Sequence, residues 1–435
     1  MDLLISNARL ITQRGLVRTE IAVDNGKIER VGKRAVMPRG EDVLKLPTSS
    51  LLFPGIVDVH AHLRDMELTH KGDFASETQA AASGGITYVT DMPNSRPPTL
   101  TSEALLDKVD RARGRVAVDF GLNLGVSGNE SELVEVRENI AFGEIFVGPS
   151  TEGQVVSYEE LERALRIIAG TGKVACIHAE DPSLFGSGND DYDHPSARPP
   201  EAEAQAIARV LALNEEIGAR LHFSHVSTRR GLLTIAGFRS AGTDVTCEVT
   251  PHHLVLTRES YDLLGTEAKM NPPLRGEDDV NAMVEGVRSG LVDVIASDHA
   301  PHAPEEKEAS VETAPSGVPG FETFIPSVLT CLEERGIPPS TLVQLASINP
   351  SKVFKIPGKG YSRGMDADFV VVEKAKRRVD PDTFISKGKY SPFSGMELKY
   401  WPSMTMLRGM VISEGGETTI KDRGKFIPPG NGTVG

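Results

Sequence analysis

Cysteine is scarce in this chain. Its 435 residues include three cysteines, Cys176, Cys247 and Cys331, which are an odd number and lie far apart. This pattern excludes a disulfide framework and a zinc site built from thiolates, and it favours a reducing compartment, so we expect a cytoplasmic protein. Cys176 and Cys247 lie in apolar runs, and we expect both thiols to be packed in the core.

An excess of basic charge and long apolar runs are also absent. The chain has 47 Lys and Arg against 61 Asp and Glu, a net charge of −14. Nucleic acids and anionic membranes attract basic surfaces, so neither is expected as the main partner. No run approaches the roughly 20 apolar residues of a membrane span. The first residues, Met1–Asn7, lack a basic segment followed by an apolar one, so no signal peptide is expected.

The third absence is a glycine-rich phosphate loop after an early strand, which an open doubly wound sheet would need. From residue 51 the chain instead repeats the order strand, loop and amphipathic helix. The strand-like runs are 52–60, 85–91, 115–126, 144–148, 173–180, 220–227, 244–250 and 293–298. Eight such units in about 250 residues predict an α/β fold, a (β/α)8 TIM-like barrel, with the doubly wound sheet as the alternative.

Both ends of the chain differ from this middle part. Residues 1–50 contain short strand-like runs and an Asn25-Gly26 turn, which is a strong hairpin signal. Strand-like runs return after about residue 350, at Asp368–Val372, Ser403–Arg408 and Met410–Ser413. We therefore predict a small β-sandwich module formed by both chain ends, residues 1–50 and 352–435, around a barrel of residues 51–351.

Polar side chains gather where the predicted strands end. His60 and His62 follow the first strand, and residues i and i+2 of an extended segment point to the same side, so both can reach one metal ion. A lone pair of this kind is weak evidence. Most other strands end in the same way, and the side chains concerned are Asp91, Asn94, His178, Glu180, His225, His252, His253, Asp298, His299 and His302. Because catalytic residues of such barrels lie at the carboxyl ends of the strands, the joint pattern indicates a metal site.

The types of ligand narrow the chemistry. Imidazole and carboxylate without thiolate suit zinc, and four histidines, one bridging carboxylate and one terminal aspartate form a natural two-metal site. Two metals that share a water would lower its pKa towards neutrality and make it a nucleophile. Asp298 could take the proton and deliver it to a leaving nitrogen. The predicted reaction is hydrolysis of an amide-type carbon–nitrogen bond, or its reverse.

Three further residues indicate the substrate. The guanidinium of Arg64 suits a carboxylate, although an ion pair with Asp65 would need the same residue. Asn94 and Asn271 lie beside prolines and could bind a planar amide ring, although either could instead serve only to form a turn. An anionic ring that carries amide groups would use all three.

Several motifs resemble those of the cyclic amidohydrolases, and among these the class I dihydroorotases. The motifs are Pro54–Arg64, Asp91–Asn94, His178–Glu180, His225–Thr228, Lys269–Arg275 and Ala296–His302, and the resemblance extends to Ser391–Leu398 in the C-terminal part. It covers nearly the whole chain. It implies the reversible ring closure of N-carbamoyl-L-aspartate to L-dihydroorotate, in pyrimidine biosynthesis.

The resemblance also implies a role for each matching residue. One metal is expected on His60, His62 and Asp298, and the other on His178 and His225, with Asp298 as the general base or acid. The substrate carboxylate is expected on Arg64, Asn94 and His302, and the pyrimidine ring on Asn271. His222 is expected to be structural, and His252, His253 and His299 match family positions without an assigned role. The resemblance leaves two partnerships open, a homodimer and an association with aspartate carbamoyltransferase.

The chain departs from the family pattern at two places. Many members bridge two metals, commonly zinc, with a carboxylated lysine on strand 4. Here that run is Gly143–Val147, with Glu144 at the lysine position, so no carboxylated lysine is expected and Glu144 is the predicted bridge. Glu152 is the alternative. The second departure is Asp65-Met66 after Arg64, where Glu-Pro is usual, and it affects the shape of the loop.

Two other functions compete with this interpretation. A hydantoinase, dihydropyrimidinase or allantoinase would share most of the motifs, but Arg64 with Asn94 favours a substrate that bears a carboxylate. A relative without activity, acting as a scaffold, would be expected to have lost ligands, and here only the bridging position is altered. The segment Ala303–Gly320, rich in proline and acidic residues, is the predicted mobile loop.

Overall fold

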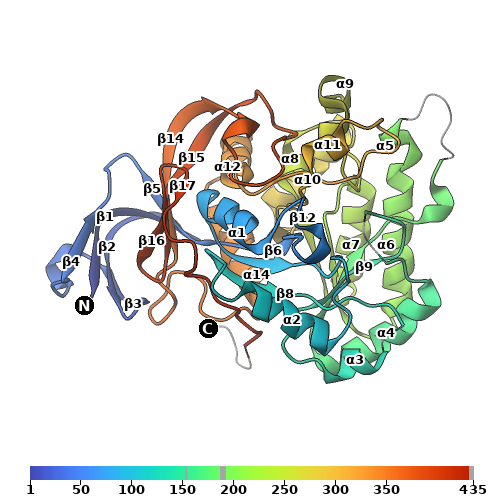
Figure 1. Ribbon diagram of the computed structural model, residues 1–435, viewed down its shortest axis with the longest axis horizontal. Helices are drawn as coiled ribbons and strands as arrows, with labels where there is room; N and C mark the ends of the chain where they lie inside the picture. The colour runs from blue at the N-terminus through green and yellow to red at the C-terminus, as the bar shows by residue number, and fades with distance from the viewer. Residues whose placement is uncertain (129, 152–153, 187–192, 431–435) are drawn as a thin grey trace.

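A closed barrel of eight parallel strands forms the centre of the computed structural model, which describes residues 1–128, 130–151, 154–186 and 193–430 (Figure 1). Three strands form one sheet and five form the other, and the bridges Leu124–Phe142 and Ala61–His299 join the two sheets. The strands are β6 (Ile56–Ala61), β7 (Ile86–Asp91), β8 (Asp119–Leu122), β9 (Phe142–Phe146), β10 (Val174–His178), β11 (Arg220–Phe223), β12 (Val245–Val249) and β13 (Val294–Ile295). The predicted (β/α)8 barrel is confirmed.

Helices follow the barrel strands in chain order. The main ones are α1 (Phe74–Ser83), α2 (Ser102–Ala112), α3 (Glu130–Glu135), α4 (Tyr158–Thr171), α6 (Pro200–Asn214), α7 (Arg229–Ser240), α10 (Glu277–Ser289) and α12 (Phe324–Glu334). The shorter ones are α5 (His194–Ala197), α8 (Pro251–Val255), α9 (Ser260–Leu264), α11 (Pro304–Lys307), α13 (Ser340–Val343) and α14 (Asn349–Val353). Among the described residues, no helix is long and apolar enough to cross a membrane.

Helix α4 illustrates how the sequence specifies these elements. Ser157 caps its first turn, since its hydroxyl accepts a hydrogen bond from the Glu160 amide while the Glu160 carboxylate accepts one from the Ser157 amide. The buried side chains Leu161, Ala164, Leu165 and Ile168 recur at helical spacing and pack on the barrel. The helix ends at Gly172, whose φ of 66° is left-handed.

Apolar side chains fill the barrel at the amino-terminal ends of its strands. Tyr88, Val174 and Val294 pack there with Phe354 and Ile356, which follow α14. A second, larger core lies between the strands and the surrounding helices. Because the amino-terminal half is filled in this way, the carboxyl ends of the strands are left for polar side chains.

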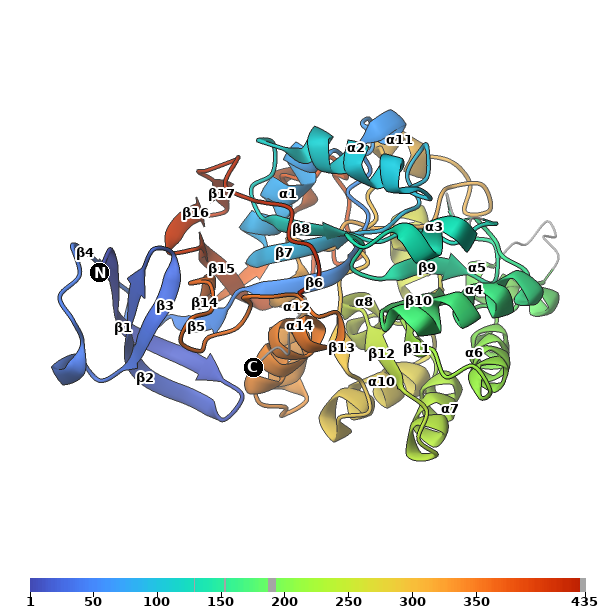
Figure 2. The ribbon, with the colours of Figure 1, turned by 90° about the horizontal axis from the view of Figure 1, so that it is seen from below.

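Strands from both ends of the chain form one β module, as the sequence predicts. Its nine strands are ordered β17-β16-β15-β14-β5-β1-β2-β3, and β4 pairs with β1. They are β1 (Leu3–Thr12), β2 (Gly15–Asp24), β3 (Lys27–Gly32), β4 (Asp42–Lys45), β5 (Leu51–Pro54), β14 (Phe369–Arg378), β15 (Glu397–Leu407), β16 (Met410–Glu414) and β17 (Glu417–Thr418). Figures 1 and 2 both place β1–β4 at the end of the molecule opposite α4, α6 and α7.

The single strand predicted over residues 52–60 is wrong, because the structure has two strands there. Leu51–Pro54 pairs with β14 in the module, whereas Ile56–Ala61 enters the barrel. Gly55 separates them, and a Cβ at this position would lie 2.1 Å from the hydroxyl oxygen of Thr87. Only glycine permits this close approach to β7, and it passes the chain from one sheet to the other.

A buried ion network joins the barrel to the module. Lys359 Nζ lies 2.8 Å from an Asp119 oxygen at the start of β8 and 2.6 Å from an Asp368 oxygen beside β14. Arg408 adds a 2.7 Å contact to Asp119. Burial would lower the pKa of Lys359, but the surrounding carboxylates outweigh it and raise that pKa above its ordinary value. The lysine is therefore charged, and it neutralises carboxylates that would otherwise be buried unpaired.

We expect Lys359→Met to lower the free energy of unfolding by about 3–5 kcal/mol, since it leaves the buried carboxylate of Asp368 without its cation and that of Asp119 with Arg408 alone. Urea unfolding followed by circular dichroism measures this. The matched control is Lys376→Met on β14, which removes an exposed pair with Glu397 (2.7 Å) and should cost less than about 1 kcal/mol. Equal losses for the two variants would contradict the assigned role of Lys359.

Candidate metal centre

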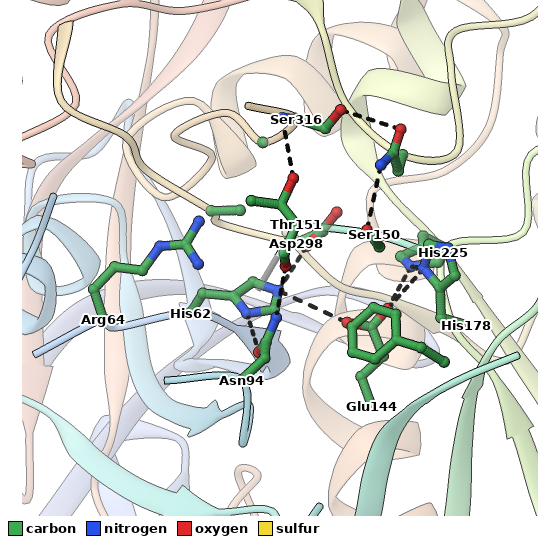
Figure 3. Close-up of a pocket in the computed structure, with 14 residues that line it drawn as sticks. His62, Arg64, Asn94, Glu144, Ser150, Thr151, His178, His225, Asp298 and Ser316 are labelled. Carbon is green, nitrogen blue, oxygen red and sulfur yellow. Dashed lines mark hydrogen bonds and ion pairs between the residues drawn. The ribbon is translucent and has the colours of Figure 1, made fainter. Parts of the chain in front are cut away.

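A polar cavity opens at the carboxyl ends of the barrel strands (Figure 3). Five of the six predicted metal ligands line it, namely His62, Glu144, His178, His225 and Asp298. The sixth, His60, lies beside them and is fully buried. The structure therefore brings together all six side chains, which come from β6, β9, β10 and the segments just after β6, β11 and β13.

Two histidines and one aspartate form the first group. His62 Nε2 lies 3.2 Å from Asp298 Oδ1, and His60 Nε2 lies 3.5 Å from the same oxygen. Each of the three residues offers one nitrogen or oxygen that could bind a metal, and these three atoms lie within 4.8 Å of one another. Three side chains that converge in this way can act as ligands of one ion.

The second group contains the other two histidines and Glu144. Glu144 Oε1 lies 2.7 Å from His225 Nε2 and 3.2 Å from His178 Nδ1, and the two imidazole nitrogens are 3.0 Å apart. Figure 3 shows both rings directed at the Glu144 carboxylate from one side. This arrangement offers two nitrogens and one oxygen to a second ion.

The two oxygens of Glu144 face different groups. While Oε1 contacts His178 and His225, Oε2 lies 3.6 Å from His60 Nε2 and 4.0 Å from His62 Nε2. A carboxylate placed in this way can give one oxygen to each of two ions. The alternative bridge, Glu152, lies outside the described residues.

A bulge in β9 directs Glu144 into the cavity. Phe142 and Ile145 pair with β10 residues that are only two apart, so Gly143 and Glu144 together oppose Cys176. The extra residue shifts the alternation of side chains by one position. Phe142 and Ile145 therefore both face the helices, and Glu144 between them lines the cavity. At Gly143, φ is 118° and a Cβ would lie 2.4 Å from the Cys176 carbonyl oxygen, so the bulge requires glycine.

Two candidate ligands have strained backbones. His225 and Asp298 follow β11 and β13 with φ values of 34° and 46°, in the left-handed region. This region costs a residue with a Cβ about 1–2 kcal/mol. Such strain persists where the rest of the fold determines the direction of a side chain, and here both side chains line the cavity.

The electrostatics of the centre favour ionised carboxylates. Burial would raise the pKa of Glu144, but the charge of His60 and hydrogen bonds with His178 and His225 hold that pKa well below its ordinary range. Burial also opposes ionisation of Asp298, and His60 and His62 lower its pKa in turn. In the neutral form that imidazoles take as metal ligands, the four histidines leave two buried negative charges, which would attract a cation.

The Nε2 atom of His60 shows that these residues fit a metal ion. This atom is buried and has no hydrogen-bond partner among the described residues, and it points between Glu144 and Asp298. A buried polar atom without a partner is costly, so it indicates a missing ligand. An unpartnered imidazole nitrogen directed at two carboxylates fits a divalent metal ion.

Behind His60 lies a polar chain that sequence reasoning missed. His60 Nδ1 contacts the Glu248 carboxylate, and the other Glu248 oxygen lies 3.1 Å from His222 Nε2. His222 Nδ1 lies 2.8 Å from the hydroxyl of Thr246. The signal for Glu248 was a charged residue inside the apolar run of β12. His222 has the structural position that was predicted for it.

Arg64 is the central residue among those predicted to bind the substrate carboxylate. This residue lines the cavity, its Nε donates to the Pro301 carbonyl oxygen at 3.0 Å, and its Nη2 lies 3.2 Å from His302 Nε2. His302 is buried behind Arg64 and is not among the described residues that line the cavity. A direct contact between His302 and substrate stays a prediction, and in the structure its ring supports the arginine.

Asn94 and Asn271 both line the cavity. Asn94 Oδ1 lies 2.8 Å from His62 Nδ1, so this residue orients a candidate metal ligand. Asn271 contacts two hydroxyls that sequence reasoning missed, those of Ser150 at 3.3 Å and Ser316 at 3.1 Å. Their contacts with substrate stay predictions.

Comparison with known proteins identifies the family. The chain matches the model of the amidohydrolase family over residues 51–412. The chain belongs to the amidohydrolase family. This amidohydrolase is 38% identical to a dihydroorotase of Methanosarcina acetivorans, over 98% of this chain and 95% of the relative. It is 35% identical to a dihydroorotase of Pyrococcus furiosus, over 98% of this chain and 96% of the relative. An L-hydantoinase (dihydropyrimidinase) of Arthrobacter aurescens has a similar structure, with a TM-score of 0.93 and 32% identity. The match covers 98% of this chain and 99% of the hydantoinase.

Other polar residues at the strand ends of the amidohydrolase are held by structural contacts. Glu180 binds Arg198 and lies 3.1 Å from His178 Nε2, so it orients a candidate ligand from outside the cavity. Asp91 pairs with Lys108 at 2.7 Å. His299 contacts Glu77 at 2.9 Å and stacks on Phe321. His253 bonds to Thr250. His252 differs, since its Nε2 is buried without a hydrogen-bond partner among the described residues, and burial lowers its pKa to about 4.

The segment 303–320 forms part of the cavity wall. Ser316 and Gly317 line the cavity, and the Ser316 amide donates to the Thr151 hydroxyl at 3.2 Å. Lys269 Nζ donates to the carbonyl oxygens of Glu312 and Ala314. These bonds anchor the segment in the structure, and its mobility stays a prediction.

We expect Glu248→Gln to weaken zinc binding about 10- to 100-fold, because the amide no longer holds His60 with a full charge. Competition with a chromogenic chelator measures the affinity. Glu203→Gln is the matched control, since Glu203 is also buried but binds Ser227 and Thr228 away from the cavity. An unchanged affinity in Glu248→Gln would contradict the role given to this glutamate.

Proposed function

We propose that this amidohydrolase is a dihydroorotase, which catalyses the reversible cyclisation of N-carbamoyl-L-aspartate to L-dihydroorotate. The observation that carries the proposal is Arg64 on the wall of the cavity that holds the candidate metal ligands. A metal centre can activate water for hydrolysis of a cyclic amide, and a fixed cation beside it can bind a substrate carboxylate. Dihydroorotate has both an amide ring and a carboxylate.

The proposed cofactor is zinc, with two ions in each chain. His60, His62 and Asp298 would hold one ion, and His178 and His225 the other. Glu144 would bridge the two, as the placement of its two oxygens supports. When bound, the ions supply Lewis acidity at the carbonyl that is attacked.

Asp298 is the proposed general base and acid. Its carboxylate lines the cavity beside His62, and the lowered pKa keeps it ionised and able to accept a proton. In ring opening it takes a proton from the attacking water and delivers it to the ring nitrogen that leaves. In ring closure it takes the proton from the carbamoyl nitrogen and returns it to the water that leaves.

Substrate would be oriented by other side chains of the cavity. Arg64 would bind the carboxylate, with Asn94 beside it and His302 in support. Asn271 would hydrogen-bond the ring, and its contacts with Ser150 and Ser316 fix the orientation of its amide. Fixing both the ring and the carboxylate positions one carbonyl for attack.

A hydantoinase or dihydropyrimidinase activity is the second candidate. It is favoured by the likeness to the L-hydantoinase structure, at 32% identity. The two functions differ in whether the preferred ring carries a carboxylate, so the role of Arg64 separates them.

Ring opening by zinc-loaded protein should be compared on dihydroorotate, dihydrouracil, hydantoin and allantoin. We expect turnover mainly of dihydroorotate. Arg64→Met should raise KM for dihydroorotate about 100-fold, because it removes one partner of a buried charge pair, and should change KM for dihydrouracil little. Failure to open dihydroorotate, or a preference for dihydrouracil, would contradict the proposal.

The proposal also covers the domains, the cellular location and the assembly of the protein. We assign residues 51–351 to the catalytic barrel and residues 1–50 and 352–435 to the β module, except that Leu51–Pro54 pairs with β14 and belongs to the module. The three buried free thiols support a cytoplasmic location. A homodimer and a complex with aspartate carbamoyltransferase are the two proposed assemblies, and light scattering of the chain alone and of the mixture tests both.

A further inference from the structure

The face of the barrel opposite the metal centre has a pocket of about 790 Å³. Its walls come from the starts of β10 and β11, the end of α4, the segment around α14, and Pro429 with Gly430. Val174 and Arg220 are the first residues of their strands, whereas His178 ends β10 at the metal centre. The pocket is therefore separate from the candidate active site, and its volume is within the range of small-molecule sites.

Positive charge is concentrated in this pocket. Five cationic side chains line it, and none of the carboxylates that the structure describes does. They are Arg137, Lys173, Arg220, Lys352 and Lys355. The chain as a whole has a net charge of −14, so this cluster differs from the rest of the surface.

Carboxylates neutralise little of this charge. Arg220 pairs with Asp244 at 3.0 Å, and that aspartate side chain is 60% exposed. Lys355 Nζ and Arg220 Nη1 donate to the carbonyl oxygen of Gly172, at 3.2 and 3.4 Å. A carbonyl oxygen fixes the position of a cation but does not cancel its charge. The pocket therefore holds oriented cations with charge available for a ligand.

Lys173 is the most deeply placed of these cations. Its Nζ donates to the carbonyl oxygens of Arg137 and Asn139, both at 2.8 Å, and to the side-chain oxygen of Asn139. All three N–H groups are used in this way, so Lys173 contributes its charge to the pocket and not a hydrogen bond to a ligand. Burial and repulsion from Arg137 and Lys355 lower its pKa to about 8, against the attraction of Glu138. A bound anion would relieve this repulsion.

Apolar side chains form the other part of the lining, and they include Ile140, Val174, Val353, Phe354 and Pro429. A site for a bare inorganic anion has no need of such a surface. Cations beside an apolar wall suit an anion that carries an organic group, since the wall can pack against that group.

We propose that this pocket is a second ligand site, which binds a phosphate-bearing anion of the size of a nucleoside polyphosphate. The guanidinium group of Arg137 suits a bidentate contact with phosphate oxygens, and the lysines add point charges. Arg220 uses Nε for Asp244 and Nη1 for Gly172, and its Nη2 remains for a contact with the ligand. The organic part of the ligand rests on the apolar wall.

Isothermal titration of zinc-loaded protein with adenosine triphosphate, inorganic pyrophosphate and citrate tests the proposal. We expect adenosine triphosphate to bind more tightly than pyrophosphate, and citrate to bind weakest. The test variant is Lys352→Glu/Lys355→Glu, since both side chains are exposed and their replacement leaves the core intact. It should bind adenosine triphosphate at least about tenfold more weakly.

The matched control is Lys45→Glu/Lys376→Glu, which makes the same change of charge at exposed positions of the β module. Its affinity should equal that of the wild type. No binding to the wild type, equal binding to the pocket variant, or citrate binding as tightly as adenosine triphosphate would overturn the proposal. None of these residues lies in the metal centre, so the result is independent of the dihydroorotate assay.

Discussion

Replacing Asp298 by asparagine is expected to lower kcat for dihydroorotate ring opening about 10⁴-fold, the upper end of what general acid–base catalysis contributes. Asparagine keeps the shape and one oxygen of the side chain, but it cannot accept the proton of the attacking water. It also removes negative charge from a site where Asp298 Oδ1 lies 3.2 Å from His62 Nε2. Steady-state assays in both directions, on variant protein saturated with zinc, measure the loss.

Asp181→Asn is the matched control for this experiment. Asp181 is also buried near the carboxyl end of β10, but its carboxylate binds Gln205 and Arg209 and does not line the cavity. Its turnover should stay close to that of the wild type. Metal content should be measured in parallel, so that loss of a ligand is distinguished from loss of the base. If Asp298→Asn kept more than about a tenth of the wild-type kcat, Asp298 could not be the general base.

Glu144→Gln is expected to have the second large effect, on metal content. The amide has no negative charge and offers one carbonyl oxygen in place of two carboxylate oxygens, so the bridge between the two histidine pairs is lost. We expect zinc affinity to fall at least about 100-fold, at the upper end of losses for changes around metal ligands. Mass spectrometry of the metal that remains after dialysis against a weak chelator measures it.

Glu152→Gln is the comparison that separates the two candidate bridges. If Glu144 is the bridge, Glu152→Gln keeps the full wild-type zinc content under the same dialysis. The reverse pattern, with zinc lost from Glu152→Gln and kept by Glu144→Gln, would assign the bridge to Glu152. Circular dichroism of each variant establishes that a loss of metal is not a loss of fold.

The order of strands and helices could be predicted because it depends on local patterns. Each barrel strand is a short apolar run, and helices such as α4 start with a capping residue. Local patterns did not predict the break between two strands at Gly55. Residues 52–57 are apolar and were interpreted with 58–60 as one strand, although the Pro54-Gly55 pair within the run is a common break between elements. The pair does not reveal that the chain changes sheets there. That change depends on the close approach of β7, a contact between residues about 30 positions apart.

The candidate site was predictable where ligands end a strand, as His60, His62 and His178 do. The bulge at Gly143 was not predictable, and regular alternation continued from Phe142 would have directed Glu144 towards the helices, to the same side as Phe142. The Glu248 contact was missed for a similar reason, since it links β12 to β6 across the barrel. His302 was predicted to bind substrate from its position in a motif. That position does not reveal that its ring lies behind Arg64.

The carboxylate of Glu144 has a consequence for how the metal centre would be assembled. A lysine bridge becomes a ligand only after it has reacted with dissolved carbon dioxide, so that centre depends on a chemical step after folding. Glu144 carries its negative charge as soon as it is translated, and the bulge in β9 aims it when the barrel closes. Maturation of this centre would then require zinc alone, at a rate independent of bicarbonate.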